Sequence, residues 1–146
     1  MLHAGWRERR VHAPRDDFDG LRALIVAEAI PPPGRIWSDA DWRVIGQGHK
    51  SGDMDDKWHA LVVEDRLYLH RSWTGRGIYE AQLVRVPGGW RIVAAVVEGD
   101  GSSYRRHDDA YETALLEALT DGKLLGAHDR PSHERLARIR AELGMT

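Results

Sequence analysis

The sequence predicts an α+β fold, an antiparallel meander sheet of four or five strands with C-terminal helices packed on it. Between residues 57 and 98, four short runs rich in Val, Ile, Leu, Tyr and Trp are separated by turn-like segments, which is typical of consecutive antiparallel strands. Beyond residue 108, apolar side chains recur at helical spacing in two segments. The 146 residues contain no internal repeat and no linker, so we expect a single domain over 16–146, preceded by a loose, polar arm at 1–15.

The composition excludes several classes of protein. Hydrophobic residues make up 42% of the chain and the net charge is −2, which favours a folded domain over a disordered chain. No run of about 18 apolar residues is present, so no membrane-spanning helix is expected. The mixed charge makes nucleic-acid binding the least favoured function. The absence of cysteine excludes disulfides and thiolate zinc sites and fits a cytoplasmic protein.

The segment before the meander gives a less regular pattern. Apolar residues at helical spacing predict a helix over 16–29, with a strand over 22–28 as the alternative. The three prolines at 31–33 end this element, because proline cannot continue a helix. Residues 34–56 are expected to be irregular, with one short strand at 42–45, because much of this segment is rich in Gly, Asp and Ser.

The four runs of the meander are KWHALVVE, RLYLHR, GIYEAQLVRV and WRIVAAVVE. The separators ED, SWTGR and PGG are turn-like. In the fourth run both alternating faces are apolar, so we expect this strand to be central and covered on both sides. Helices are expected near 109–121 and 131–143, because aspartate or proline stands near each start and glycine near each end.

The chain contains none of the common catalytic or cofactor-binding motifs. The glycine-rich segment 46–52 includes Lys50, but a strand is expected to follow it, which disfavours a phosphate-binding loop. His49 lies near several aspartates, and HDD occurs at 107–109. Solvated loops and helix N-termini favour aspartate without any metal. We therefore predict no metal site and no cofactor.

The first hairpin concentrates the residues that can carry chemistry. Its two strands are joined by Glu64 and Asp65, and counting outward from this turn places Trp58 opposite Arg71 and Asp56 opposite Trp73. One end of the sheet should then hold Asp55, Asp56, Lys57, Trp58, His70, Arg71, Ser72, Trp73 and Thr74.

We interpret this end of the sheet as a ligand pocket. Arg71 would offer its donor fork to a phosphate or carboxylate, and Trp73 or Trp58 would stack on a ring. Asp56 or His70 would transfer a proton in an enzyme. The other predicted ligand contacts are Lys57, Ser72, Thr74 and Tyr79.

A purely structural role is the alternative for the same residues. Asp56 would form an ion pair with Arg71, and Trp73 would close one end of the core. Gly75 and Gly77 would permit the turn. Under this interpretation, the segment HRSWTG serves the fold alone.

Three segments together resemble a family of small bacterial proteins that is known only as uncharacterised. They are MDDKW, DRLYLHRSWTG followed by Tyr79, and DDAYETALLEAL. The resemblance covers roughly residues 53–125. It implies a shared fold and carries no activity with it.

Two function classes follow from the sequence. The first is a protein that binds a phosphorylated or nucleotide-like small molecule through Arg71 and Trp73, with or without catalysis. The second is a non-enzymatic interaction module, such as an immunity or regulatory protein, whose exposed Trp and Arg side chains anchor a protein partner.

Overall fold

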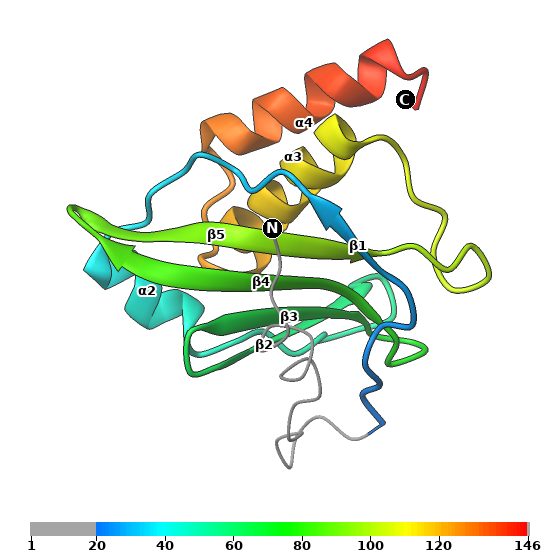
Figure 1. Ribbon diagram of the computed structural model, residues 1–146, viewed down its shortest axis with the longest axis horizontal. Helices are drawn as coiled ribbons and strands as arrows, with labels where there is room; N and C mark the ends of the chain where they lie inside the picture. The colour runs from blue at the N-terminus through cyan, green and yellow to red at the C-terminus, as the bar shows by residue number, and fades with distance from the viewer. Residues whose placement is uncertain (1–19, 146) are drawn as a thin grey trace.

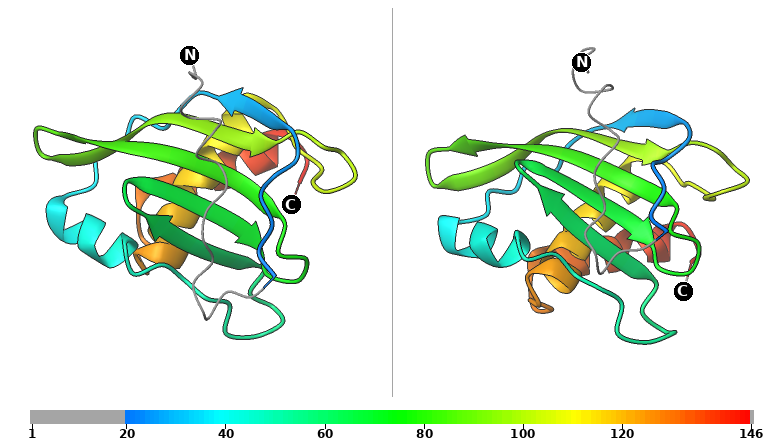
Figure 2. Two further views of the ribbon diagram at one scale, coloured as in Figure 1. Left: turned by 60° about the horizontal axis from the view of Figure 1, so that its bottom comes forward. Right: turned by 90° about the horizontal axis from the view of Figure 1, so that it is seen from below.

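The computed structural model describes residues 20–145. It contains a five-stranded sheet with the strand order β1-β5-β4-β3-β2, in which every neighbouring pair is antiparallel. Helices α3 and α4 lie together on one face of this sheet (Figures 1 and 2). The predicted α+β class is therefore confirmed. The strands are β1 (Ala27–Ile30), β2 (Trp58–Val63), β3 (Arg66–Arg71), β4 (Gly77–Val86) and β5 (Gly89–Glu98).

The hairpin of β2 and β3 has the predicted register. Val63 pairs with Arg66 across the two-residue turn, and Trp58 pairs with Arg71 at the open end. The backbone N–H of Ser72 donates to the carbonyl of Lys57 at 2.9 Å, which extends the pairing by one residue. The start of β2 and the end of β3 thus lie side by side, as a two-residue turn requires.

The turn between β3 and β4 depends on Gly75. Its φ of 73° lies in the left-handed region, which side chains rarely adopt. A Cβ atom built on it would lie 2.2 Å from the carbonyl oxygen of Gly20. The predicted role of this glycine in the turn is confirmed, and the turn is packed directly against the segment that leads into β1.

The largest part of the core lies between the sheet and the helices. Helix α3 (Asp109–Leu119) begins at Asp108, whose carboxylate accepts from the backbone N–H of Tyr111. It continues into the π-helical segment η1 (Thr120–Leu124), and α4 (Pro131–Glu142) packs on α3. Both C-terminal helices were predicted at these positions. Strand β5 is buried on both faces over residues 95–98, whereas Val93 is exposed on one face.

The predicted helix before the meander is wrong. The predicted helix over 16–29 is replaced by β1 within the described residues, and the alternative strand over 22–28 overlaps β1 only in part. The cause is tertiary, because all four residues of β1 pair with β5. The start of the predicted helix and the predicted arm at 1–15 lie outside the described residues.

The predicted strand at 42–45 is a helix, α2 (Asp39–Ile45). The side chain of Ser38 caps it by accepting a hydrogen bond from the backbone N–H of Asp41 at 3.0 Å, which is a common way to start a helix. Asp39 and Asp41 in its first turn add a favourable interaction with the helix dipole. This short capped helix packs against β5 and η1. Over the described range, no helix is long and apolar enough to cross a membrane.

Candidate functional site

Three adjoining cavities lie where the open end of the β2–β3 hairpin meets the loop at 99–108 and the two C-terminal helices. The central cavity, of about 260 Å³, is lined by residues from all of these elements. The tryptophan cavity, of about 460 Å³, is lined by Lys57, Arg71, Trp73, Thr74 and Ser103. The histidine cavity, of about 390 Å³, lies toward α4 and includes His128 and His133 in its lining. Lys57 lines all three cavities, so they adjoin one another, and we refer to them together as the cleft.

The central cavity is strongly cationic. Lys57, Arg71, Arg105 and Arg140 line it together with His107, and no carboxylate is among its lining residues. Within residues 20–145, neither the lysine nor any of the three arginines takes part in an ion pair. Cations that converge without a neutralising carboxylate create a positive potential in a cleft. Such a cleft attracts anions, and arginine forks match the geometry of phosphate and carboxylate.

Aromatic rings form the support for these cations. The guanidinium carbon of Arg71 lies 4.5 Å from the centroid of the Trp58 ring and 5.7 Å from that of Tyr104. Arg140 stands in a similar way 5.9 Å from the ring of Tyr111. A guanidinium over a ring is held by cation–π attraction while the N–H groups at its edge remain able to donate. The arginines are therefore oriented without a carboxylate partner.

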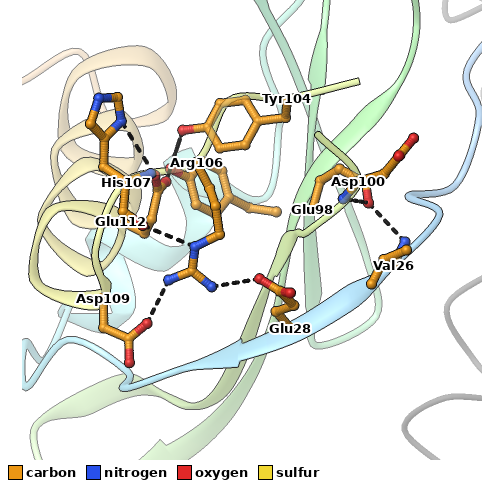
Figure 3. Close-up of polar contacts among 10 residues, drawn as sticks. Val26, Glu28, Glu98, Asp100, Tyr104, Arg106, His107, Asp109 and Glu112 are labelled. Atoms are coloured by element: carbon orange, nitrogen blue, oxygen red, sulfur yellow. Dashed lines mark hydrogen bonds and ion pairs between the residues drawn. The ribbon is translucent and has the colours of Figure 1, made fainter. Parts of the chain in front are cut away.

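The loop at 99–108 supplies three of the lining residues, and polar contacts at both of its ends fix it (Figure 3). At the start, the buried carboxylate of Glu98 accepts from the backbone N–H of Val26 at 2.7 Å and of Asp100 at 3.0 Å. At the end, Arg106 donates to Glu28 at 2.8 Å and to Asp109 at 2.5 Å (Figure 3). The loop is thus fastened to β1 and to α3.

Glu112 organises the wall of the central cavity. Its fully buried carboxylate accepts from the hydroxyls of Tyr79 and Tyr104 and from the backbone N–H of His107 at 2.7 Å. Burial, together with the neighbouring Glu112 carboxylate, raises the pKa of the Tyr104 phenol well above its usual value. Burial also raises the pKa of Tyr79, helped by the electrostatic influence of Tyr104 and Glu112. Both phenols therefore remain protonated donors, and they hold the ring of Tyr104 in the cavity wall.

The structure brings five of the nine predicted site residues to this cleft. Lys57, Trp58 and Arg71 line the central cavity, and Trp73 and Thr74 line the tryptophan cavity. Ser72 lines none of the three cavities, and its hydroxyl donates to the backbone carbonyl of Asp56 at 2.9 Å.

Like Ser72, the other three predicted residues line none of the three cavities: Asp56, His70 and Tyr79. His70 is buried, and its Nδ1 lies 2.9 Å from the carbonyl oxygen of Gly75, to which it donates. Tyr79 is buried and supports Tyr104 through Glu112. Their positions favour structural support over contact with a ligand.

The predicted ion pair between Asp56 and Arg71 is wrong. Among the described residues, the partners of the Asp56 carboxylate are His49 Nε2 at 2.6 Å, Lys123 Nζ at 3.2 Å and the backbone N–H of Trp58 at 3.3 Å. The chain forms a turn just before β2, in which Asp53 Oδ1 accepts a hydrogen bond from the backbone N–H of Asp56 at 3.0 Å. This turn bends the chain before the strand begins, so Asp56 does not continue the register that places Trp58 opposite Arg71.

The contacts of Asp56 also set its ionisation. Partial burial opposes the charged form, but hydrogen bonds from His49, Lys123 and the Trp58 backbone lower the pKa of Asp56 below its usual value. A lower pKa makes Asp56 a weaker base. Its contacts tie the loop before β2 to η1, so its role in this structure is to hold the rim of the cleft in place.

Four lining residues of the central cavity were not predicted from the sequence: Tyr104, Arg105, His107 and Arg140. The first three stand in the run YRRH, where two cations and two rings in a loop form a readable signal. Arg140 gives no such signal, because other arginines share its helix. Within the described part of the chain, no group of three or more His, Cys, Asp or Glu side chains could hold a metal ion.

Comparisons with known proteins add no relative. No protein-family model, curated protein or solved structure matches this chain. The resemblance carried by MDDKW and HRSWTG therefore stays a prediction, and the function rests on the site alone.

Proposed function

We propose that this protein binds a phosphorylated, ring-bearing small molecule of the nucleotide class in the cleft at the open end of the β2–β3 hairpin. The observation that carries the proposal is the central cavity, where four cations without ion-pair partners in the described residues converge and no carboxylate lines the wall. Phosphate groups provide the multiple negative oxygens that such a set of donors can satisfy.

Each cation has a distinct part in this proposal. Arg71 and Arg140 are held over aromatic rings, so each offers an oriented fork with little loss of side-chain entropy on binding. Lys57 stands where the three cavities meet and provides a mobile point charge. Arg105 is exposed at the mouth and would attract the ligand before it enters.

The ring of the ligand would lie in the tryptophan cavity. Trp73 is 70% exposed, and its Nε1 donates to the carbonyl of Met54 at 3.2 Å. This hydrogen bond holds the indole at its edge and leaves ring surface for stacking. Arg71 lines the same cavity, so a stacked ring and a bound phosphate would be joined over a short path.

For hydrolysis or group transfer, we propose His107 as the general acid or base. It lines the central cavity, and its Nδ1 lies 3.9 Å from the Glu112 carboxylate. Imidazole is suited to proton transfer near neutral pH. Asp56 and His70, the groups predicted from the sequence, line none of the three cavities.

Titration calorimetry with pyrophosphate tests the proposal. We expect Arg71→Ala and Arg140→Ala each to weaken binding by about tenfold or more, because each removes a charge-assisted donor. Arg138→Ala is the matched control, since Arg138 is an exposed arginine of the same helix that lines none of the cavities. Equal affinities for the parent, the two cleft variants and the control would show that the cleft is not an anion site.

A protein-interaction module is the second candidate function, and one observation favours it. Trp73 and Met54 are 70% and 72% exposed and lie side by side, joined by the indole hydrogen bond. Tryptophan is enriched at the centres of protein interfaces. A protein retained from a host lysate by the parent and lost with Trp73→Ala, but not displaced by pyrophosphate, would support this function over ligand binding.

A further inference from the structure

We infer that the ligand is two-sided, with two ring-bearing groups joined through a pyrophosphate, as in a dinucleotide. This inference rests on the proposed function and specifies its ligand class. It follows from the order of the cavities, because the cationic central cavity lies between two larger cavities rather than at the end of one.

Shared residues establish that order. Arg71 lines both the central and the tryptophan cavities, whereas Arg140 lines both the central and the histidine cavities. Lys57 belongs to all three. An anion held between Arg71 and Arg140 would therefore have open space on both sides, and a ligand with one ring would leave one of the two outer cavities empty.

The histidine cavity has the chemistry of a ring site. Its wall is apolar where α3 and α4 meet, through Leu115, Leu119 and Leu136. Its rim carries His128 and His133, whose ring centroids are 5.8 Å apart. Apolar walls with a few placed polar groups are typical of sites for small organic ligands.

Two details make the rim suitable for a heterocycle. His133 Nε2 lies 2.8 Å from the carbonyl oxygen of Ala127, and because a carbonyl only accepts, Nε2 carries the proton and Nδ1 of the neutral ring is an acceptor. Gly122 lies beneath the two rings, and a Cβ there would stand 3.2 Å from His133 Cε1 and 3.6 Å from His128 Cε1. A side chain at this position would crowd the edges of the two histidine rings.

Titration calorimetry of the full chain with three compounds tests the inference. The compounds are pyrophosphate, ADP, and diadenosine diphosphate, in which two adenosines are joined 5′ to 5′ through a pyrophosphate. We expect the affinity to rise about tenfold from the first to the second and about tenfold again to the third, because each stacked ring contributes at about this level.

Variants assign each ring to its cavity. We expect Trp73→Ala and His128→Ala each to reduce the affinity for diadenosine diphosphate to about that for ADP, while binding of pyrophosphate is unchanged. Both residues are exposed, so neither change should prevent folding. Arg138→Ala serves again as the control and should alter no affinity.

The possible outcomes distinguish a failure of the two-sided ligand from a failure of the proposed anion-binding function. If pyrophosphate binds with the expected dependence on Arg71 but ADP and diadenosine diphosphate bind equally well, the two-sided ligand is wrong and the anion site stands. If diadenosine diphosphate binds most tightly but His128→Ala has no effect, the histidine cavity is not the second ring site. If none of the three compounds binds, both the inference and the proposed function are overturned.

Discussion

Arg71 and Trp58 are cross-strand partners in the β2–β3 hairpin, and the guanidinium carbon of Arg71 lies 4.5 Å from the centroid of the Trp58 ring. The structural interpretation of the sequence gives Arg71 a different partner, the carboxylate of Asp56. The difference matters for function, because an ion pair with Asp56 would neutralise Arg71, whereas stacking on Trp58 orients it and leaves its charge available. The stability of variants distinguishes the two arrangements.

The first prediction concerns Arg71→Ala. Removing a half-buried arginine that stacks on a ring should lower the free energy of unfolding by about 0.5–2 kcal/mol. Breaking a buried ion pair would instead cost about 3–5 kcal/mol. Urea denaturation of the parent and the variant measures the difference, with Arg91→Ala, an exposed arginine on β5, as the control. A loss near the larger value would contradict the stacked arrangement.

The second prediction concerns the buried carboxylate of Glu112. Glu112→Gln replaces one acceptor oxygen with an amide that can only donate, so the hydroxyls of Tyr79 and Tyr104 and the N–H of His107 can no longer all be satisfied. We expect the free energy of unfolding to fall by about 1–3 kcal/mol. Glu134→Gln, at an exposed position of α4, should change it little. An equal effect of the two substitutions would mean that the Glu112 contacts contribute nothing.

The same substitution should weaken pyrophosphate binding, because the loop that carries Arg105 and His107 is held partly through Glu112. Calorimetry at a temperature where the variant is folded measures this effect. Unchanged affinity would show that the cations of the central cavity do not depend on the buried network.

The third prediction is a pH dependence that arises from Asp56. The pKa of Asp56 is lower in the folded protein than the 3.8 of the free side chain. Its contribution is therefore fully present above about pH 4 and is lost as the pH falls through the folded-state value. In Asp56→Asn this contribution is absent at every pH.

Chemical denaturation of both proteins between about pH 7 and pH 3 checks the third prediction. The parent should be the more stable protein near neutral pH, and the difference should shrink as the pH drops below about 4. A difference that stays constant over this range would mean that the carboxylate of Asp56 is not stabilised by His49 and Lys123.

The fourth prediction concerns the turn between β3 and β4. Gly75→Ala places a Cβ 2.2 Å from the backbone of Gly20 at a φ of 73°, so it should destabilise the fold by more than about 1 kcal/mol. Gly101→Ala is the matched control, because a Cβ at Gly101 meets nothing within 4 Å. Thermal unfolding of the two variants should show a lower melting temperature only for Gly75→Ala.

Much of the sheet could be predicted from the sequence because its determinants are local. Alternation of side chains sets which face of a strand is buried, and the two-residue turn at Glu64 and Asp65 sets the register of the first hairpin. That register is enough to place Lys57, Trp58 and Arg71 at the same end of the sheet. Helix α2 could also have been predicted from the sequence, because Ser38 followed by Asp39 and Asp41 is a typical helix start signal.

Only the tertiary structure determined what surrounds Arg71. Strand β1 forms because it pairs with β5, about seventy positions further along the chain, and no local pattern encodes such a partner. Arg105 comes from a loop and Arg140 from a helix, and packing of α3 and α4 on the sheet brings both to the central cavity. Asp56 was predicted beside Arg71 from strand register, but a turn at Asp53 directs it to His49 and Lys123. Register applies only where the strand continues, so side chains just beyond its end are placed by the contacts of the loop.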